Sequence, residues 1–204
     1  MTSRRGCGGL LSLGMGLAML LGFSACSGTG VDRAGAGAPE SQDRSLAPYV
    51  VTSPDVVEEA LRLAGVGKDD LVYDLGSGDG RIVIAAARRY GARGIGFELQ
   101  SDLVRRAEEN ARLAGVSHLV EFRQQDVLTV DLAPATVVTV YLSPEANLLL
   151  RPRMQEQLRP GARVVSYEFN MGDWLPDVFR QVRDESGRVR ALYLWRIGPR
   201  RLGS

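Results

Sequence analysis

The chain has 204 residues, of which 45% are hydrophobic and 24% are charged. This is enough apolar sequence for the core of one ordinary domain, and it argues against a chain that is disordered throughout. The 25 basic and 24 acidic residues leave a formal net charge of +1, so there is no basic excess of the kind that attracts nucleic acid, and no nucleic-acid partner is expected.

Residues 1–26 resemble an export signal. An arginine pair precedes an apolar run over residues 10–23, which is shorter than the roughly 20 residues that cross a bilayer. Small residues then lead to Cys26, as in the signals of bacterial lipoproteins, in which this cysteine becomes lipidated. We expect an exported protein that is lipid-anchored at a bacterial membrane and faces the periplasm or the outside. The alternatives are an uncleaved anchor and a cytoplasmic enzyme with a misassigned start codon.

Residues 27–47 are rich in Gly, Ala, Ser and Pro, which predicts a flexible linker. One domain is predicted over residues 48–204. The two cysteines, Cys7 and Cys26, both precede this domain. No disulfide and no cysteine metal site are therefore expected in it.

The domain is predicted to alternate helices and strands. A helix over residues 54–64 has proline in its first turn, ends at Gly65, and is expected to act as a lid before the first strand. The elements predicted to follow are a strand at 71–75, a helix at 81–90, a strand at 93–98, a helix at 101–114, and strands at 120–124, 136–142 and 162–169. The helix that starts at Pro144 is expected to break into two pieces at Pro152.

The C-terminal part has a different pattern. Residues 178–183 and 188–197 flank a turn at 185–187, and Val189, Tyr193 and Trp195 fall on one face of a strand, which predicts an antiparallel hairpin. The whole pattern predicts an α/β fold with a doubly wound, mostly parallel sheet. The ligand of such a sheet lies at the carboxyl ends of its strands.

The stretch at residues 71–80, L-V-Y-D-L-G-S-G-D-G, is the centre of this domain. Its apolar strand runs into Gly76, Gly78 and Gly80, which let the backbone turn sharply and let a ligand approach without a Cβ in the way. The helix that follows offers free N–H groups to an anion. The dinucleotide pattern G-x-G-x-x-G is not matched, because Arg81 stands where a third small residue is expected.

Three carboxylates follow successive predicted strands, with Asp74 and Glu98 at the ends of the first two and Asp126 just after the third. They suit a ligand that has an ammonium group, a ribose diol and an adenine amino group. S-adenosylmethionine has all three and no phosphate, and its carboxylate can lie at the helix N-terminus near Arg81. The alternative for Asp74 is to anchor the glycine turn, and for Asp126 to cap the following loop.

Residues 48–197 resemble the class I, seven-stranded, S-adenosylmethionine-dependent methyltransferases. The resemblance lies in D-L-G-S-G-D-G at residues 74–80 and G-F-E-L-Q at 96–100. More narrowly, P-Y-V-V-T-S-P at 48–54 and M-G-D-W at 171–174 are similar to the family of the mitochondrial lysine N-methyltransferases of the ATP synthase c subunit and the adenine nucleotide translocase, with their bacterial relatives.

The resemblance implies a Rossmann-like seven-stranded sheet and a methyltransferase that acts on a protein lysine without a metal. The alternatives are a small-molecule or lipid acceptor, and a non-catalytic exported relative that keeps the fold. The cofactor contacts that the resemblance implies are Tyr49, Thr52, Asp74, Gly76, Ser77, Gly78, Glu98 and Asp126.

Candidate residues for the methyl acceptor lie where the fourth and fifth predicted strands end. An amine nucleophile must be neutral and in line with the donor, which a carboxylate or a dry aromatic pocket can arrange. Tyr141, Asn170 and Trp174 are the predicted catalytic residues, although both aromatics also suit a core. The wider candidate set adds Ser143, Glu168 and Asp173. Because L-S-P-E at 142–145 differs from the D/N-P-P-Y/F motif, methylation of DNA adenine or of glutamine is not expected.

Overall fold

The computed structural model describes residues 52–199. The predicted signal, the linker and Tyr49 lie outside this part of the chain. The helices and strands are α1 (Pro54–Ala64), β1 (Leu71–Leu75), α2 (Arg81–Tyr90), β2 (Arg93–Glu98), α3 (Ser101–Leu113), β3 (Val120–Gln124), the 3-10 helix η1 (Val127–Thr129), β4 (Val137–Val140), α4 (Pro144–Gln157), β5 (Arg163–Tyr167), β6 (Val178–Arg183) and β7 (Val189–Arg196).

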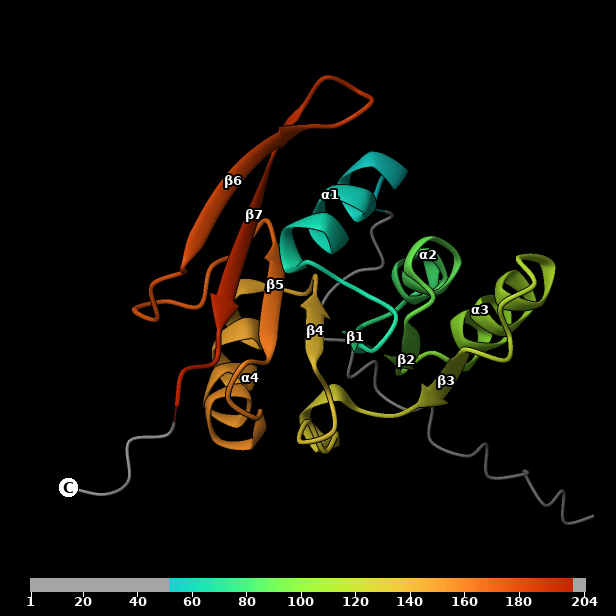
Figure 1. The fold of residues 1–204 in the computed structure, drawn as a ribbon, viewed down its shortest axis with the longest axis horizontal. Coiled ribbons are helices and arrows are strands. Elements are labelled where there is room, and N and C mark those ends of the chain that lie inside the picture. The colour runs from blue at the N-terminus through green and yellow to red at the C-terminus, as the bar shows by residue number, and fades with distance from the viewer. Residues whose placement is uncertain (1–51, 200–204) are drawn as a thin grey trace, which may run out of the picture. The chain divides into compact units, whose positions relative to one another are not determined.

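The strands form one seven-stranded sheet in the order β3-β2-β1-β4-β5-β7-β6 (Figure 1). The ladders from β3 to β5 are parallel, and β7 runs antiparallel between β5 and β6. The predicted doubly wound fold with its terminal hairpin is confirmed. The strand order reverses at β1, which pairs with β2 on one side and β4 on the other, and such a switch point leaves a crevice at the carboxyl ends of the strands.

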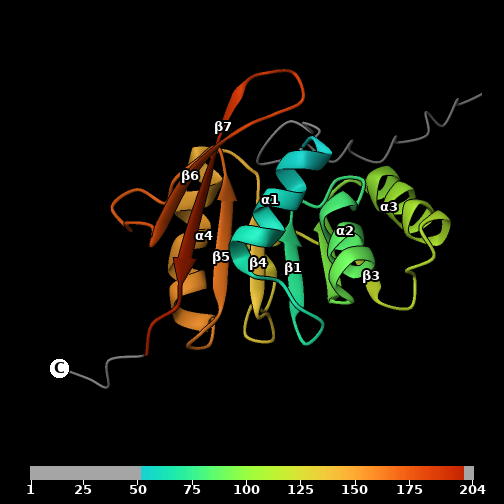
Figure 2. The same cartoon turned by 45° about the horizontal axis from the view of Figure 1, so that its top comes forward.

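Helices cover both faces of the sheet. Figure 2 shows α1, α2 and α3 over one face and α4 over the other. Strand β4 illustrates the two cores, because Val137 belongs to the buried cluster that contains Leu61 of α1, whereas Val138 belongs to the one that contains Leu150 of α4. A parallel strand that is covered on both faces is a continuous apolar run, which explains the β-branched sequence of β4.

The predicted break at Pro152 is wrong, because α4 continues as one helix past this residue. Pro152 lies on the exposed side, while Ala146, Leu150 and Met154 are buried on the other side. An interior proline costs about 3 kcal/mol, and burial of Leu150 and Met154 contributes roughly 1.5–3 kcal/mol each. Packing of the buried side therefore outweighs the local penalty. No helix within residues 52–199 is long and apolar enough to span a membrane.

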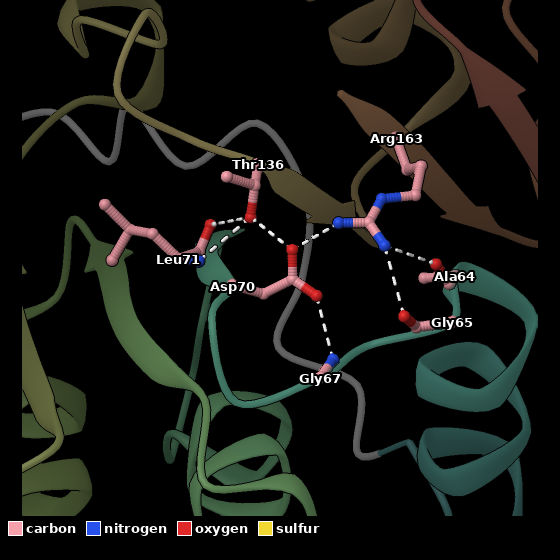
Figure 3. Close-up of polar contacts among 7 residues, drawn as sticks. All are labelled: Ala64, Gly65, Gly67, Asp70, Leu71, Thr136 and Arg163. Carbon is pink, nitrogen blue, oxygen red and sulfur yellow. Dashed lines mark hydrogen bonds and ion pairs between the residues drawn. The ribbon is translucent and has the colours of Figure 1, made fainter. Parts of the chain in front are cut away.

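At the amino ends of the strands, a polar cluster joins α1 to the sheet (Figure 3). The carboxylate of Asp70 accepts hydrogen bonds from Thr136 Oγ1 (2.7 Å) and Gly67 N (2.8 Å), and it pairs with Arg163. Arg163 Nη1 also donates to the carbonyl of Ala64 (3.0 Å) at the end of α1. These contacts fix the helix whose opposite end lies beside the glycine turn.

Candidate active site

The turn between β1 and α2 needs its glycines for two reasons. Gly76, Gly78 and Gly80 have φ values of 84°, 53° and 80°, in the left-handed region that favours glycine. Neighbouring side chains also leave no room, since a Cβ at Gly76 would lie 2.6 Å from Leu142 and one at Gly80 would lie 2.5 Å from Phe122. The sequence-predicted turn is therefore held tightly between β3 and β4.

Hydrogen bonds attach this turn to β2. The N–H groups of Gly76 and Ser77 donate to the carbonyl of Phe97, at 2.9 and 3.0 Å. The hydroxyl of Ser77 is buried and has no hydrogen-bond partner within residues 52–199. Because an unpaired buried hydroxyl costs about 1–3 kcal/mol, this atom fits a site that is completed by a polar ligand.

The carboxylate of Glu98 is oriented by backbone N–H groups. Its Oε2 accepts from Gly78 (3.0 Å), and its Oε1 accepts from Leu99 (2.8 Å) and Gln100 (3.0 Å). A carboxylate has about four acceptor positions, so Glu98 can still accept from a hydroxyl group. The structure thus fixes the residue predicted to hold a ribose directly beside the glycine turn.

Asp126 lies just after β3 and caps η1. Its Oδ1 accepts a hydrogen bond from Leu128 N at 2.9 Å. The alternative of a loop cap is thus observed, and the remaining acceptor positions of the carboxylate leave the predicted contact to an adenine amino group open.

Asp74 is 2% exposed, and its Oδ1 accepts a hydrogen bond from Thr139 Oγ1 on β4 at 2.7 Å. Burial raises the pKa of Asp74 to about 7; the hydrogen bond from Thr139 opposes this shift, and the charges of Glu98 and Asp79 add to it. A cation next to this carboxyl would favour its ionised form. Its environment therefore suits a ligand ammonium group.

One element of the site was missed by the sequence reasoning. Arg81 donates through Nε and Nη2 to the carboxylate of Asp79 (2.8 and 2.5 Å) and through Nη1 to the carbonyl of Thr52 (2.6 Å). Thr52, which lies just before α1, is thereby attached to the glycine turn, and its side chain is buried. The D-G-R sequence at 79–81 could have indicated the pairing of Arg81 with Asp79, but it does not reveal the contact of Arg81 with Thr52.

At the ends of β4 and β5 three aromatic side chains gather. The ring centroid of Tyr141 lies 4.2 Å from that of Tyr167 and 6.4 Å from that of Phe169. Burial raises the pKa of the Tyr141 phenol, and burial raises that of Tyr167 to about 12. Both phenols therefore remain protonated at neutral pH. We call Tyr141, Tyr167 and Phe169 the aromatic cluster.

The two other predicted catalytic residues lie apart from this cluster. Asn170 is exposed, and its Oδ1 accepts from Gly172 N at 3.1 Å. Trp174 packs against Trp195 with ring centroids 5.4 Å apart, in the core on the α4 face, whereas Tyr141 packs in the core on the α1 face. The structure does not gather the three residues around one point.

The remaining acceptor candidates also differ in position. Ser143 caps α4 by accepting from Ala146 N at 3.2 Å, and Asp173 forms an exposed ion pair with Arg151. Glu168 adjoins the aromatic cluster, and it has a φ of 66° although it is not glycine. Such a backbone conformation is uncommon and is typical of functional sites.

Comparisons with known proteins agree on the nature of this domain. Residues 74–178 match the family model described as the ANTKMT methyltransferase domain. The chain is 39% identical over 152 residues to a protein-lysine N-methyltransferase of Saccharolobus islandicus. This match covers 74% of this chain and 94% of that protein. It is 40% identical over 156 residues to the adenine nucleotide translocase lysine N-methyltransferase of Mus musculus, covering 76% of this chain and 67% of that protein.

A solved structure is also similar. The RNA methyltransferase from Salinibacter ruber in complex with S-adenosyl-L-homocysteine is 52% identical, with a TM-score of 0.69, and the match covers 76% of this chain and 98% of that chain.

Proposed function

Since this chain belongs to the family described as the ANTKMT methyltransferase domain and is an S-adenosylmethionine-dependent methyltransferase, we propose that it transfers the methyl group to the side-chain amine of a protein lysine. Two relatives are named lysine N-methyltransferases. The observation that carries the proposal is an aromatic cluster with an adjacent carboxylate, Glu168, at the strand ends next to the cofactor side of the crevice.

The residues present fit the cofactor. Glu98 would hold the ribose hydroxyls, Asp126 the adenine amino group and Asp74 the ammonium group, while the unpaired hydroxyl of Ser77 would receive a partner. Thr52, whose carbonyl accepts a hydrogen bond from Arg81, would close the cofactor site on the side of α1.

When bound, S-adenosylmethionine supplies a methyl group on a sulfonium, which passes to the lone pair of a neutral amine while the carbon–sulfur electron pair stays on sulfur. The protein has to bind the amine, orient it and exclude water. Such positioning contributes up to roughly 7–11 kcal/mol in well-oriented systems. The buried side chains of Thr52, Asp74 and Tyr167 would exclude water from one side of this site.

The proposal is tested by incubating the full chain with methyl-labelled S-adenosylmethionine and a bacterial lysate separated into membrane and soluble fractions. We expect label in protein, located on lysine by mass spectrometry, and much less label with the Glu98→Ala variant at the same low cofactor concentration, because lost hydrogen bonds to the ribose should weaken cofactor binding by about 1–3 kcal/mol. Label found only in the lipid or small-molecule fraction would contradict a protein acceptor.

RNA is a second candidate acceptor, because the solved relative that is 52% identical is titled an RNA methyltransferase. The balanced charge of the chain favours a protein over a polyanion. In the same experiment, label that survives protease and is removed by ribonuclease would support RNA and exclude lysine as the main acceptor.

We also propose that the chain is exported and anchored through Cys26, on the basis of its N-terminal sequence alone. Growth of a bacterial host with a labelled fatty acid should label the full chain, and a Cys26→Ser variant should remain unlabelled. Equal labelling of both would exclude a lipid on this cysteine.

A further inference from the structure

We propose that the aromatic cluster and Glu168 form the receptor for the acceptor lysine, with the rings enclosing its methylene stem and Glu168 facing its amine. This inference rests on the proposed lysine acceptor. It names the residues that select the substrate side chain, which the comparisons do not assign.

The aromatic cluster matches the chemistry of a lysine side chain. A lysine side chain has an apolar stem and a cationic end, and aromatic rings bind both, through contact with methylenes and through attraction of the cation to the ring face. Tyr167 is buried at the base of the cluster, whereas Tyr141 and Phe169 are partly exposed and can be reached from outside. The rings of Tyr141 and Phe169 lie at 25° to each other with centroids 6.4 Å apart.

The aromatic cluster also lies close to the predicted cofactor contacts. A cavity of about 10 Å³ is lined by residues that include Thr52, Thr139, Tyr141 and Tyr167, and Thr139 is hydrogen-bonded to Asp74 on β1. The aromatic cluster is thus one strand away from the predicted cofactor contacts. This cavity has the size of about one water molecule, so the stem of the lysine would lie along the partly exposed rings rather than inside the cavity.

The backbone of Glu168 is strained. A non-glycine residue in the left-handed region is energetically unfavourable, and here neighbouring groups hold it in place. Its N–H donates to the carbonyl of Ala191 (2.8 Å), while the carbonyl of Phe169 accepts from Ser166 Oγ (2.6 Å) and from Nδ2 of the fully buried Asn147 (3.2 Å). The fold therefore holds Glu168 beside the rings at a cost.

The charges around Glu168 also suit a cationic side chain. Arg190 donates to Glu168 Oε1 at 3.2 Å and, more closely, to Asp184 Oδ2 at 2.6 Å. Two carboxylates thus share one guanidinium, which leaves a net charge of −1 in this group of three side chains. A lysine ammonium that approaches the rings would meet an excess negative charge at Glu168. Before methyl transfer it gives up one proton, to the carboxylate of Glu168 or through it to water, and the lone pair that is left on nitrogen takes the methyl group.

The test measures binding, so it does not depend on knowing the acceptor protein. The probe is a bisubstrate analogue of S-adenosylhomocysteine in which a nitrogen atom replaces the sulfur. A two-carbon link joins this nitrogen to the nitrogen of a butylamine, and the butylamine mimics the lysine side chain. Calorimetry on the full chain compares this amine analogue with S-adenosylhomocysteine and with a second, methylene analogue, in which a methylene group replaces the butylamine nitrogen.

We expect the amine analogue to bind wild type at least about tenfold more tightly than S-adenosylhomocysteine. In Phe169→Leu neither analogue should bind more tightly than S-adenosylhomocysteine. In Glu168→Gln the preference for amine over methylene should be lost. Both variants should keep the wild-type affinity for S-adenosylhomocysteine, which shows that they are folded.

The matched controls are Phe179→Leu and Glu185→Gln, which change an exposed ring on β6 and an exposed carboxylate in the hairpin turn. Both should bind all probes like wild type. If wild type gains nothing from the lysine mimic, the proposed function fails, and this inference fails with it. If wild type gains and the two cluster variants keep the full gain, the lysine acceptor stands and the location proposed for it is overturned.

Discussion

Asp74 combines structural and chemical roles in one side chain. It is almost fully buried in the middle of the sheet, its hydrogen bond joins β1 to β4, and burial raises its pKa to about 7. A carboxyl of this kind is tolerated in its neutral form and becomes costly when it ionises without a cation. It is therefore suited to a ligand that brings a positive charge.

We predict that the free energy of unfolding falls as the pH rises from about 4 to about 7, because of Asp74. Its pKa is about 7 in the folded protein and near 3.8 ordinarily, so the folded state holds the proton more tightly than the unfolded state. The stabilisation is complete below about pH 4 and is lost as the pH rises to about 7, at up to roughly 1.4 kcal/mol per pH unit.

Urea unfolding of wild type and Asp74→Asn between pH 4 and pH 8 measures this effect. The asparagine variant should lack this fall in stability, because its side chain does not titrate. Parallel stability curves for the two proteins would show that another group is responsible.

Glu168→Gly and Glu168→Gln separate strain from charge at the proposed acceptor site. Both variants remove the carboxylate, but only glycine relieves the φ of 66°. Relief of the left-handed conformation should stabilise the glycine variant by roughly 1–2 kcal/mol. The greater freedom of glycine in the unfolded chain cancels about 0.5–1 kcal/mol of this gain. In urea unfolding the glycine variant should be more stable than the glutamine variant by about 0.5–1 kcal/mol, and equal stabilities would exclude strain at this position.

The positions of the predicted donor-side residues could be derived from the sequence, and those of the proposed acceptor-side residues only in part. Gly76, Gly78 and Glu98 follow directly after strands, so local pattern and strand period place them. Glu168 could not be singled out, because its strained φ leaves no sign in the sequence and its partner Arg190 is on another strand. The packing of Trp174 against Trp195 could not be predicted either, because the two residues lie on different segments of the chain.

At the scale of elements, α1 is held at both ends by arginines. Arg163 binds its C-terminal carbonyls at the amino ends of the strands, and Arg81 binds the carbonyl of Thr52 just before its start. The helix was predicted from its caps and its apolar face. These two contacts were not predicted, because they join residues far apart in the sequence.

Asp70→Ala should strongly destabilise the protein while leaving cofactor binding intact. Although burial raises the pKa of Asp70, hydrogen bonds from Thr136 and Gly67 and the charge of Arg163 lower it below its ordinary value. Removing the carboxylate leaves Arg163, whose side chain is 21% exposed, without this partner. We expect a loss of about 3 kcal/mol in the free energy of unfolding.

The neighbouring Asp69→Ala is the matched control, because the Lys68–Asp69 ion pair is almost fully exposed. It should change stability by less than about 0.5 kcal/mol. Calorimetry should find the same affinity for S-adenosylmethionine in both variants, since this cluster lies at the amino ends of the strands. Equal stabilities of the two variants would show that the Asp70 cluster does not hold α1.

At the scale of the whole molecule, the sheet joins the cofactor side to the distant tryptophans. The chain has two tryptophans, Trp174 and Trp195, and both pack in the core on the α4 face. With cofactor at one hundred times its dissociation constant, the free energy of unfolding should rise by about 2.7 kcal/mol. Because the strands form one continuous sheet, tryptophan fluorescence and far-UV circular dichroism should report the same increase. If circular dichroism reports this increase and tryptophan fluorescence does not, the hairpin side of the sheet unfolds independently.

The reversal of strand order at β1 also separates the two tasks along the chain. Residues 71–126 supply most of the predicted cofactor contacts, and the proposed receptor for the acceptor comes from residues 141–169, beyond the β1–β4 border. During divergence from a common ancestor, substitutions in the later segment can therefore change which molecule is methylated while the earlier segment keeps the same methyl donor. The strand order makes acceptor choice a property that can be inherited, or exchanged between relatives, separately from donor binding.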